Sequence, residues 1–215
     1  MEERNITVTL NKAKEWFNSG NATLKEIALQ AFDKDELKFN FKNITTFKKA
    51  CEALGLNYDD MFYITKNIAT ISKASAAMFK LNIIRKALNL GQDLHLTKDP
   101  EDSYIYYPYN PFVTKSSTYY KSDINSGKME VIGKIKSGGE KYNVLGGYAD
   151  YGGLAGLGCF YSDGGVGDAL ADVGFLGCAT KEIAEHFGKY FGMLITEAKY
   201  GDMIDFEIIE ATHYD

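Results

Sequence analysis

The sequence predicts an α+β fold, in which a small helical N-terminal unit precedes a glycine- and aromatic-rich antiparallel sheet with one C-terminal helix. Helical spacing of apolar residues dominates the first hundred residues, whereas alternating, strand-like segments and one long helix follow. Composition changes at the same place: 13 of the 15 tyrosines follow residue 100, and 15 of the 21 glycines lie between Gly138 and Gly192. These observations predict two domains, residues 1–98 and 99–215.

The N-terminal domain is expected to start with a short strand at residues 6–10 and to continue with helices. Residues that favour helix N-caps precede four of these helices: Asn11, Thr23, Thr45 and Asn57. The strongest helix covers residues 75–90, where Met78, Leu81, Ile84, Arg85 and Leu88 repeat at intervals of three and four. Gly20, Gly55 and Gly91 follow the ends of helices.

The C-terminal domain is expected to be mostly strands. YIYYPYNPF contains Pro108 and Pro111, which exclude a central strand and allow an edge strand or an extended arm. Strands are predicted at residues 129–135, 140–145, 157–161, 173–176 and 203–209, with SGGE as a hairpin turn between the first two. Thr180 is the predicted N-cap of the long C-terminal helix.

Charge and composition exclude several classes of protein. The net charge is −5, which disfavours a nucleic-acid partner. The charge is uneven, because residues 1–100 hold 15 Lys/Arg and 12 Asp/Glu, whereas residues 101–215 hold 9 and 17. No apolar run approaches the roughly 20 residues of a membrane span, and no signal-peptide pattern is present, so we expect no membrane association and a protein that is made and kept in a cytoplasm or leaves it only by cell lysis. Cys51, Cys159 and Cys178 are expected to be buried, reduced thiols.

The segment from Gly152 to Gly177 holds nine glycines just before the C-terminal helix. It lacks the Lys of a P-loop, and Gly153, Gly156 and Gly158 form GxxGxG instead of GxGxxG. Lys181 at the helix start is the only feature that favours an anion. Glycine pairs between aromatic residues favour a tightly wound sheet, because glycine permits positive φ, bulges and close backbone approach.

The residues that could carry catalysis or hold a metal form no recognisable set. Asp163, Asp168 and Asp172 are not spaced like an EF-hand loop, so solvated turns are the better interpretation. The three histidines are far apart in the sequence: His95, His186 and His213. No serine lies in GxSxG. We therefore expect no metal, no cofactor and no enzymatic activity, although a pair of carboxylates that meets only in space stays open.

An aromatic cluster is the predicted contact surface, because Tyr, Phe and Pro suit interfaces that lose little side-chain entropy on binding. Ordinary core packing is the competing interpretation, and base stacking is disfavoured by the few lysines nearby. The candidate interface residues are Tyr104, Tyr106, Tyr107, Tyr109, Phe112, Tyr119 and Tyr120.

Two stretches carry a resemblance to a known group of proteins. LNKAKEWFNSGNATLKEIALQAFDKDEL, followed by ITTFKKACEALGL, resembles an N-terminal module in uncharacterised proteins of tailed phages and prophages of gut Bacteroidales. GFLGCATKEIAEHFGKYFGMLITEAKYGD resembles the C-terminal helix region of the same proteins. The matching positions of the helix pattern are Lys181, Glu182, Ile183, Ala184, Gly188, Lys189 and Phe191. The resemblance implies no catalytic residue.

The resemblance implies a virion protein of a crAss-like or related phage, such as a head-fibre, decoration or capsid-associated component with an N-terminal attachment domain. We therefore expect a non-enzymatic structural or adaptor protein that forms a homo-oligomer and contacts other virion proteins. The alternative is a phage-encoded intracellular regulator that binds a host protein or nucleic acid. The positive charge of the helical half and the Lys48–Lys49 pair favour this alternative.

Overall fold

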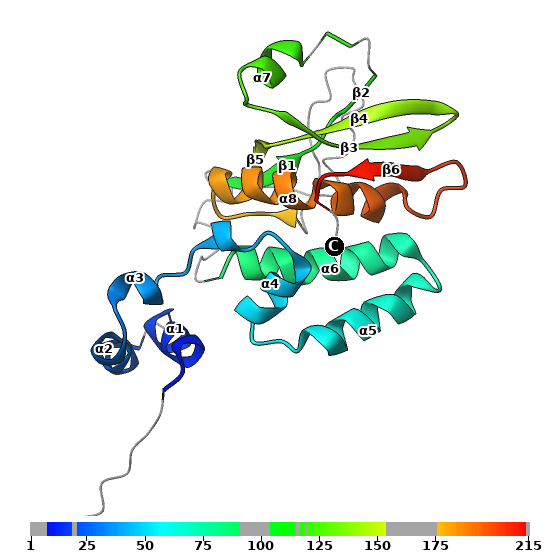
Figure 1. Ribbon diagram of the computed structural model, residues 1–215. Helices are drawn as coiled ribbons and strands as arrows, with labels where there is room; N and C mark the ends of the chain where they lie inside the picture. The colour runs from blue at the N-terminus through cyan, green and yellow to red at the C-terminus, as the bar shows by residue number, and fades with distance from the viewer. Residues whose placement is uncertain are drawn as a thin grey trace, which may run out of the picture. The chain divides into compact units, whose positions relative to one another are not determined.

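The computed structural model describes residues 8–18, 21–90, 104–114, 117–118, 120–153 and 176–213 (Figure 1). The chain forms two compact units, residues 1–41 and 42–215. The first unit is helical, and the second combines helices with two antiparallel sheets. The predicted α+β class, with an antiparallel sheet and a C-terminal helix, is confirmed.

The first unit contains three short helices, α1 (Leu10–Asn18), α2 (Ala22–Ala31) and α3 (Lys34–Leu37). Its core is small. Ala13, Ala28 and Leu37 are fully buried, and partly buried apolar side chains such as Trp16 and Phe32 pack around them. So few buried side chains give little hydrophobic stabilisation, which scales with the apolar area removed from water.

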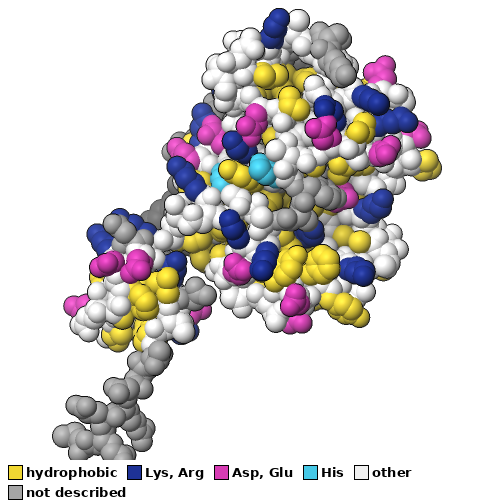
Figure 2. All heavy atoms as spheres, viewed as in Figure 1, with side chains coloured by type: hydrophobic (Ala, Val, Ile, Leu, Met, Phe, Trp, Pro, Cys, Tyr) yellow, Lys and Arg dark blue, Asp and Glu magenta, His cyan; other side chains and the backbone are white. Residues whose placement is uncertain are grey.

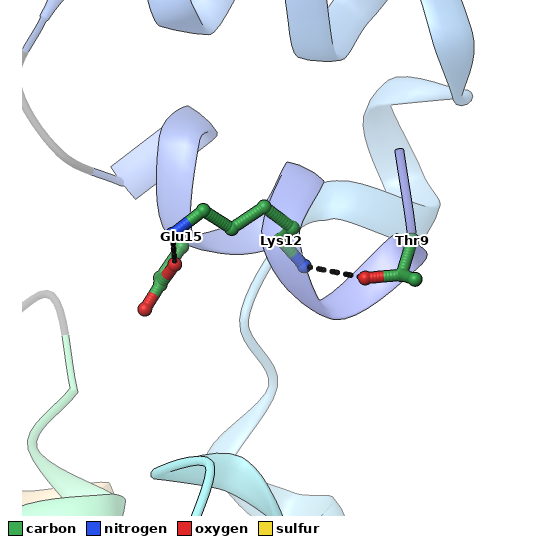
Figure 3. Close-up of polar contacts among 3 residues, drawn as sticks. All are labelled: Thr9, Lys12 and Glu15. Atoms are coloured by element: carbon green, nitrogen blue, oxygen red, sulfur yellow. Dashed lines mark hydrogen bonds and ion pairs between the residues drawn. The ribbon is translucent and has the colours of Figure 1, made fainter. Parts of the chain in front are cut away.

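A hydrogen-bonded turn leads the chain into α1 (Figure 3). The backbone N–H of Lys12 donates to the hydroxyl of Thr9 at 3.4 Å, and the ammonium group of Lys12 pairs with Glu15 (Figure 3). Thr9 therefore caps a helix that begins at Leu10, and the strand predicted at residues 6–10 is wrong in its described part. A threonine hydroxyl that caps a helix outweighs the β-branched alternation of so short a segment.

The short 3-10 helix η1 (Phe41–Asn43) spans the boundary at residue 41, and the second unit continues with α4 (Phe47–Ala53), α5 (Tyr58–Ala69) and α6 (Lys73–Leu88). A side-chain oxygen caps each of these α-helices by accepting a backbone N–H three residues ahead, as N-cap residues do. The caps are Thr46, Asn57 and Ser72. The predicted cap Asn57 is confirmed, whereas Thr46 replaces Thr45 for α4 and Asn21 replaces Thr23 for α2.

The main sheet has four strands in the order β2-β4-β3-β6: β2 (Phe112–Val113), β4 (Glu140–Gly146), β3 (Glu130–Ser137) and β6 (Glu207–Ala211). A β3–β4 hairpin forms its centre, and Gly138 and Gly139 make the turn with φ of 58° and 84°. Both angles are in the left-handed region that glycine adopts without strain, so the predicted SGGE turn is confirmed. A short helix, α7 (Lys121–Asn125), precedes β3.

A second, two-stranded sheet pairs β1 (Tyr104–Tyr109) with β5 (Tyr148–Gly153). Pro108 lies within β1 opposite Ala149, consistent with a strand outside a sheet centre. The last predicted strand is shifted, because residues 203–206 form turns and β6 begins at Glu207. The strands predicted at residues 157–161 and 173–176 lie outside the described residues, apart from Leu176, which is buried.

Helix α8 (Lys181–Tyr200) runs through the middle of the second unit, with strands on one side and α6 on the other (Figure 1). Thr180 caps it by accepting the N–H of Ile183 at 3.3 Å, as predicted. On the strand side, glycines allow backbones to meet: a methyl group on Gly188 would lie 3.0 Å from Cβ of Pro108, and one on Gly146 would lie 2.8 Å from the carbonyl oxygen of Gly188.

The chain divides at a place different from the predicted one. Helices α4 to α6 belong to the same compact unit as the sheets, and the boundary falls at residue 41 instead of residue 98. The reason is that α6 packs along α8, with Leu81, Ile84 and Leu88 fully buried. Helical spacing identifies the apolar face of α6, but it carries no information on which element covers that face.

We expect Gly146→Ala to destabilise the protein by roughly 1–3 kcal/mol, because the added methyl group must push α8 away from β4. Chemical denaturation followed by circular dichroism measures the effect. Lys141→Ala on the same strand is the control, since it shortens an exposed side chain and should change the free energy of unfolding by less than about 0.5 kcal/mol. Equal stability of the two variants would contradict the close approach of α8 to β4.

Candidate functional site

The aromatic residues predicted as a contact surface take part in packing where the structure describes them. Tyr107 is 6% exposed, and Phe112 packs against the core of the main sheet. The hydroxyls of Tyr109 and Tyr120 lie 2.9 Å apart, and both rings pack against a buried cluster of Val113, Met129 and Leu145. Tyr106 is half-buried, Tyr104 lies in β1, and Tyr119 lies outside the described residues. The described members therefore favour core packing, the interpretation that competed with an interface.

The candidate anion and metal features find little support in the described part of the chain. Residues 154–175, which include Asp163, Asp168 and Asp172, lie outside it, as does His95. Lys181 at the start of α8 pairs with Glu185 at 3.8 Å. Among the described residues, no group of three or more His, Cys, Asp and Glu side chains is placed to hold a metal ion.

Helix α5 carries more apolar side chains than it buries against the rest of the fold. Its inner positions are Tyr58, Met61, Thr65 and Ile68, which repeat at helical spacing and are half-buried or buried. Among them only Thr65 is buried, and its hydroxyl donates to the carbonyl of Met61. The helix thus rests on α4 and α6 through a narrow face.

Three consecutive residues outside this face, Phe62, Tyr63 and Ile64, are 49%, 67% and 38% exposed. Ile71, in the turn to α6, is 89% exposed. We call Asp59, Phe62, Tyr63, Ile64, Lys66 and Ile71 the α5 outer face. Figure 2 shows hydrophobic side chains gathered on the part of the surface that α5 and α6 form. Apolar surface of this kind, rimmed by polar residues, is typical of a protein–protein contact.

The charges of the α5 outer face are placed at its two ends. Asp59, Tyr63 and Lys66 are separated by four and three residues, so they lie in one row along the helix. Asp59 is in the first turn and Lys66 in the last, as the helix dipole favours. Both side chains are exposed, and neither forms an ion pair with a described residue.

This surface was not predicted, although the run Phe62–Tyr63–Ile64 in the sequence indicates it. Three consecutive apolar residues spread over roughly 200° of a helix, so they cannot all face one partner inside the fold.

The lysine pair that favoured a nucleic-acid partner has local contacts instead. Lys48 lies 5.9 Å from the ring centroid of Tyr58, and the ammonium group of Lys49 donates to the hydroxyl of Thr45 at 3.2 Å.

Two histidines that are far apart in sequence both contact the ring of one tyrosine. The ring centroid of Tyr190 lies 4.5 Å from that of His186 and 4.7 Å from that of His213. Figure 2 shows histidine side chains, in cyan, close together on one face. Nε2 of His186 lies 2.7 Å from the carbonyl oxygen of Ile44, so this nitrogen must carry the proton that is donated.

Burial lowers the pKa of His186, and the neighbouring ammonium groups of Lys189 and Lys42 lower it further, against the opposing hydrogen bond to Ile44. The described cysteines are buried free thiols, as predicted for Cys51 and Cys178. Burial raises the pKa of Cys178 to about 12, which makes it a poor nucleophile near neutral pH.

None of the described helices is long and apolar enough to cross a lipid bilayer. Comparison of the chain with protein-family models, with curated proteins and with solved structures gives no match.

We expect the imidazole of His186 to titrate in the folded protein below the ordinary value of about 6.5. The unfolded chain then binds the proton first, so this group's contribution to stability is complete above about pH 6.5 and is lost as the pH falls. Urea unfolding between pH 8 and 5, in the parent and in His186→Gln, measures it. The variant should lose part of the decline at low pH; an unchanged decline would show that another group causes it.

Proposed function

We propose that the protein is a non-enzymatic structural or adaptor protein that acts through protein–protein contacts, and that the α5 outer face joins two copies of the chain. The exposed run Phe62–Tyr63–Ile64 on a helix that is already packed on its other face carries this proposal. Leaving these side chains in water forgoes the free energy of burying them, roughly 25 cal/mol per Å² of apolar area. A partner that covers them recovers that free energy.

A second copy is the occupant that the charges favour. In an antiparallel pair of α5 helices related by a twofold axis between Phe62 and Tyr63, Asp59 of each copy lies opposite Lys66 of the other. The two positions are seven residues, or about 10.5 Å, apart along the helix. The row of Asp59, Tyr63 and Lys66 is therefore self-complementary, with an aromatic centre and an ion pair at each end.

The resemblance to proteins of tailed phages supports a place in a phage particle, as a head-fibre, decoration or capsid-associated component. Other virion proteins would then be the further partners of the assembled dimer. Most soluble oligomers are homo-oligomers with closed symmetry, and twofold dimers are the commonest of them. We propose the virion, after synthesis in the bacterial host cytoplasm, as the location of the protein.

Charge reversal tests the pairing of two copies. Asp59→Lys alone and Lys66→Glu alone should each shift the dimer toward monomer by about tenfold in dissociation constant, because each makes both symmetry-related pairs repulsive. An equimolar mixture of the two single variants should associate again, since every facing pair in the mixed dimer has opposite charge. Sedimentation equilibrium at low salt measures all three samples.

Lys121→Glu on α7 is the matched control, because it reverses an exposed charge away from α5 and should leave association unchanged. A parent protein that stays monomeric at every concentration would overturn the pairing. Single variants that dissociate without recovery in the mixture would show that α5 contacts something other than α5 of a second copy.

A second comparison separates the α5 surface from the aromatic cluster of β1. Tyr63→Ser should weaken association about tenfold or more and change monomer stability by less than about 0.5 kcal/mol, because the ring is exposed. Tyr107→Ser should cost roughly 3 kcal/mol of stability, because it empties a buried site. Thermal unfolding and sedimentation of both variants distinguish the two roles. If Tyr107→Ser weakened association and Tyr63→Ser lowered stability instead, the interface would lie on β1.

A further inference from the structure

A pocket of about 220 Å³ opens between α4, α6, α8 and the residues that follow β6. Its floor is apolar and well covered: Phe47, Ile84, Phe191 and Leu194 are all at most 5% exposed. Its rim carries hydroxyl and imidazole groups, from Thr45, Thr46, Tyr190, Thr212 and His213. None of the residues that line it is Lys, Arg, Asp or Glu. An apolar floor with a few polar groups around it is the usual composition of a small-molecule site.

The polar rim has unused hydrogen-bonding capacity. The side chains of Tyr190, Thr212 and His213 form no hydrogen bond with any residue that the structure describes. The hydroxyl of Thr46 accepts from the backbone N–H of Lys49, and that of Thr45 from its ammonium group, so both remain able to donate.

We propose that this pocket binds a small uncharged aromatic molecule with one hydrogen-bonding group, the class to which phenol and indole belong. The volume suits this class, because an apolar cavity of about 150 Å³ holds benzene. The absence of Lys, Arg, Asp and Glu from the lining disfavours an ionic ligand, because no lining side chain of these types would balance its charge. Four of the lining side chains are aromatic rings, and ring–ring contacts add about 0.5–1.5 kcal/mol beyond the area they bury.

The rim is held in place before a ligand arrives. The ring of Tyr190 contacts the rings of His186 and His213 in tilted arrangements, and the hydrogen bond from His186 to the carbonyl of Ile44 holds the first of these two imidazoles. Because the rings are already ordered, binding costs little side-chain entropy. The pocket is lined by no residue of the α5 outer face, so this site and the proposed dimer can be tested separately.

Ligand titration followed by NMR tests the site, with indole and phenol as probes. Both should shift the ring signals of Tyr190 and His213 and saturate with a dissociation constant on the order of 1 mM, as expected of so small a ligand. Cyclohexanol, which has no aromatic ring, and benzoate, which is charged, should bind at least about tenfold more weakly. Cyclohexanol binding as tight as phenol would overturn the aromatic class, and tighter binding of benzoate would overturn the uncharged class.

Thr212→Tyr places a larger side chain at the exposed rim and should weaken indole binding about tenfold or more. Thr118→Tyr adds the same group at an exposed position outside the lining and should leave binding unchanged. Thermal unfolding of each variant shows whether it is folded, and Thr212→Ala, which keeps the pocket open, should still bind. The proposal fails if indole shifts no signal of the lining residues or if Thr212→Tyr binds like the parent.

Discussion

The second unit depends on the close contact between α8 and the strands. Gly188 and Gly192 face Pro108, Asn110 and Ile132 at distances that leave no room for a side chain. The amide of Asn110 donates to the carbonyls of Leu145 and Gly188, which ties β4 to the helix at the point of contact. Backbone packing of this kind fixes the distance between layers more strictly than larger side chains do, because a glycine offers no rotamer by which it adjusts.

The layers around α8 explain why helix α5 keeps apolar side chains exposed. Helix α8 is covered by strands on one side and by α6 on the other, so its large apolar side chains are buried between these layers. Helix α5 lies outside these layers and contacts only α4 and α6 to a large extent. Its remaining apolar residues consequently point away from the core. A peripheral helix that is apolar on more than one face is the observation from which we propose the pairing of two copies.

The same layering brings distant parts of the chain together. Asp202, just after α8, accepts hydrogen bonds from the hydroxyl of Ser72 and from the N–H of Ala74, which joins the end of α8 to the start of α6. At the other side of α8, Tyr190 meets His213 beyond β6 and His186 meets Ile44 before α4. The pocket forms where these segments converge, so its lining residues are drawn from positions 45 to 213.

The sequence by itself determined the local structure: the cap Thr180, the Gly138–Gly139 turn and the helical spacing of α6 rely on interactions between near neighbours. The sequence was less informative where two neighbouring residues could each be the N-cap of one helix, as Thr45 and Thr46 could for α4. Only the tertiary structure decided that α6 packs with α8, that Tyr107 is buried while Tyr63 is exposed, and that two distant histidines contact Tyr190. Contacts across many residues depend on the path of the chain, which residue spacing does not encode.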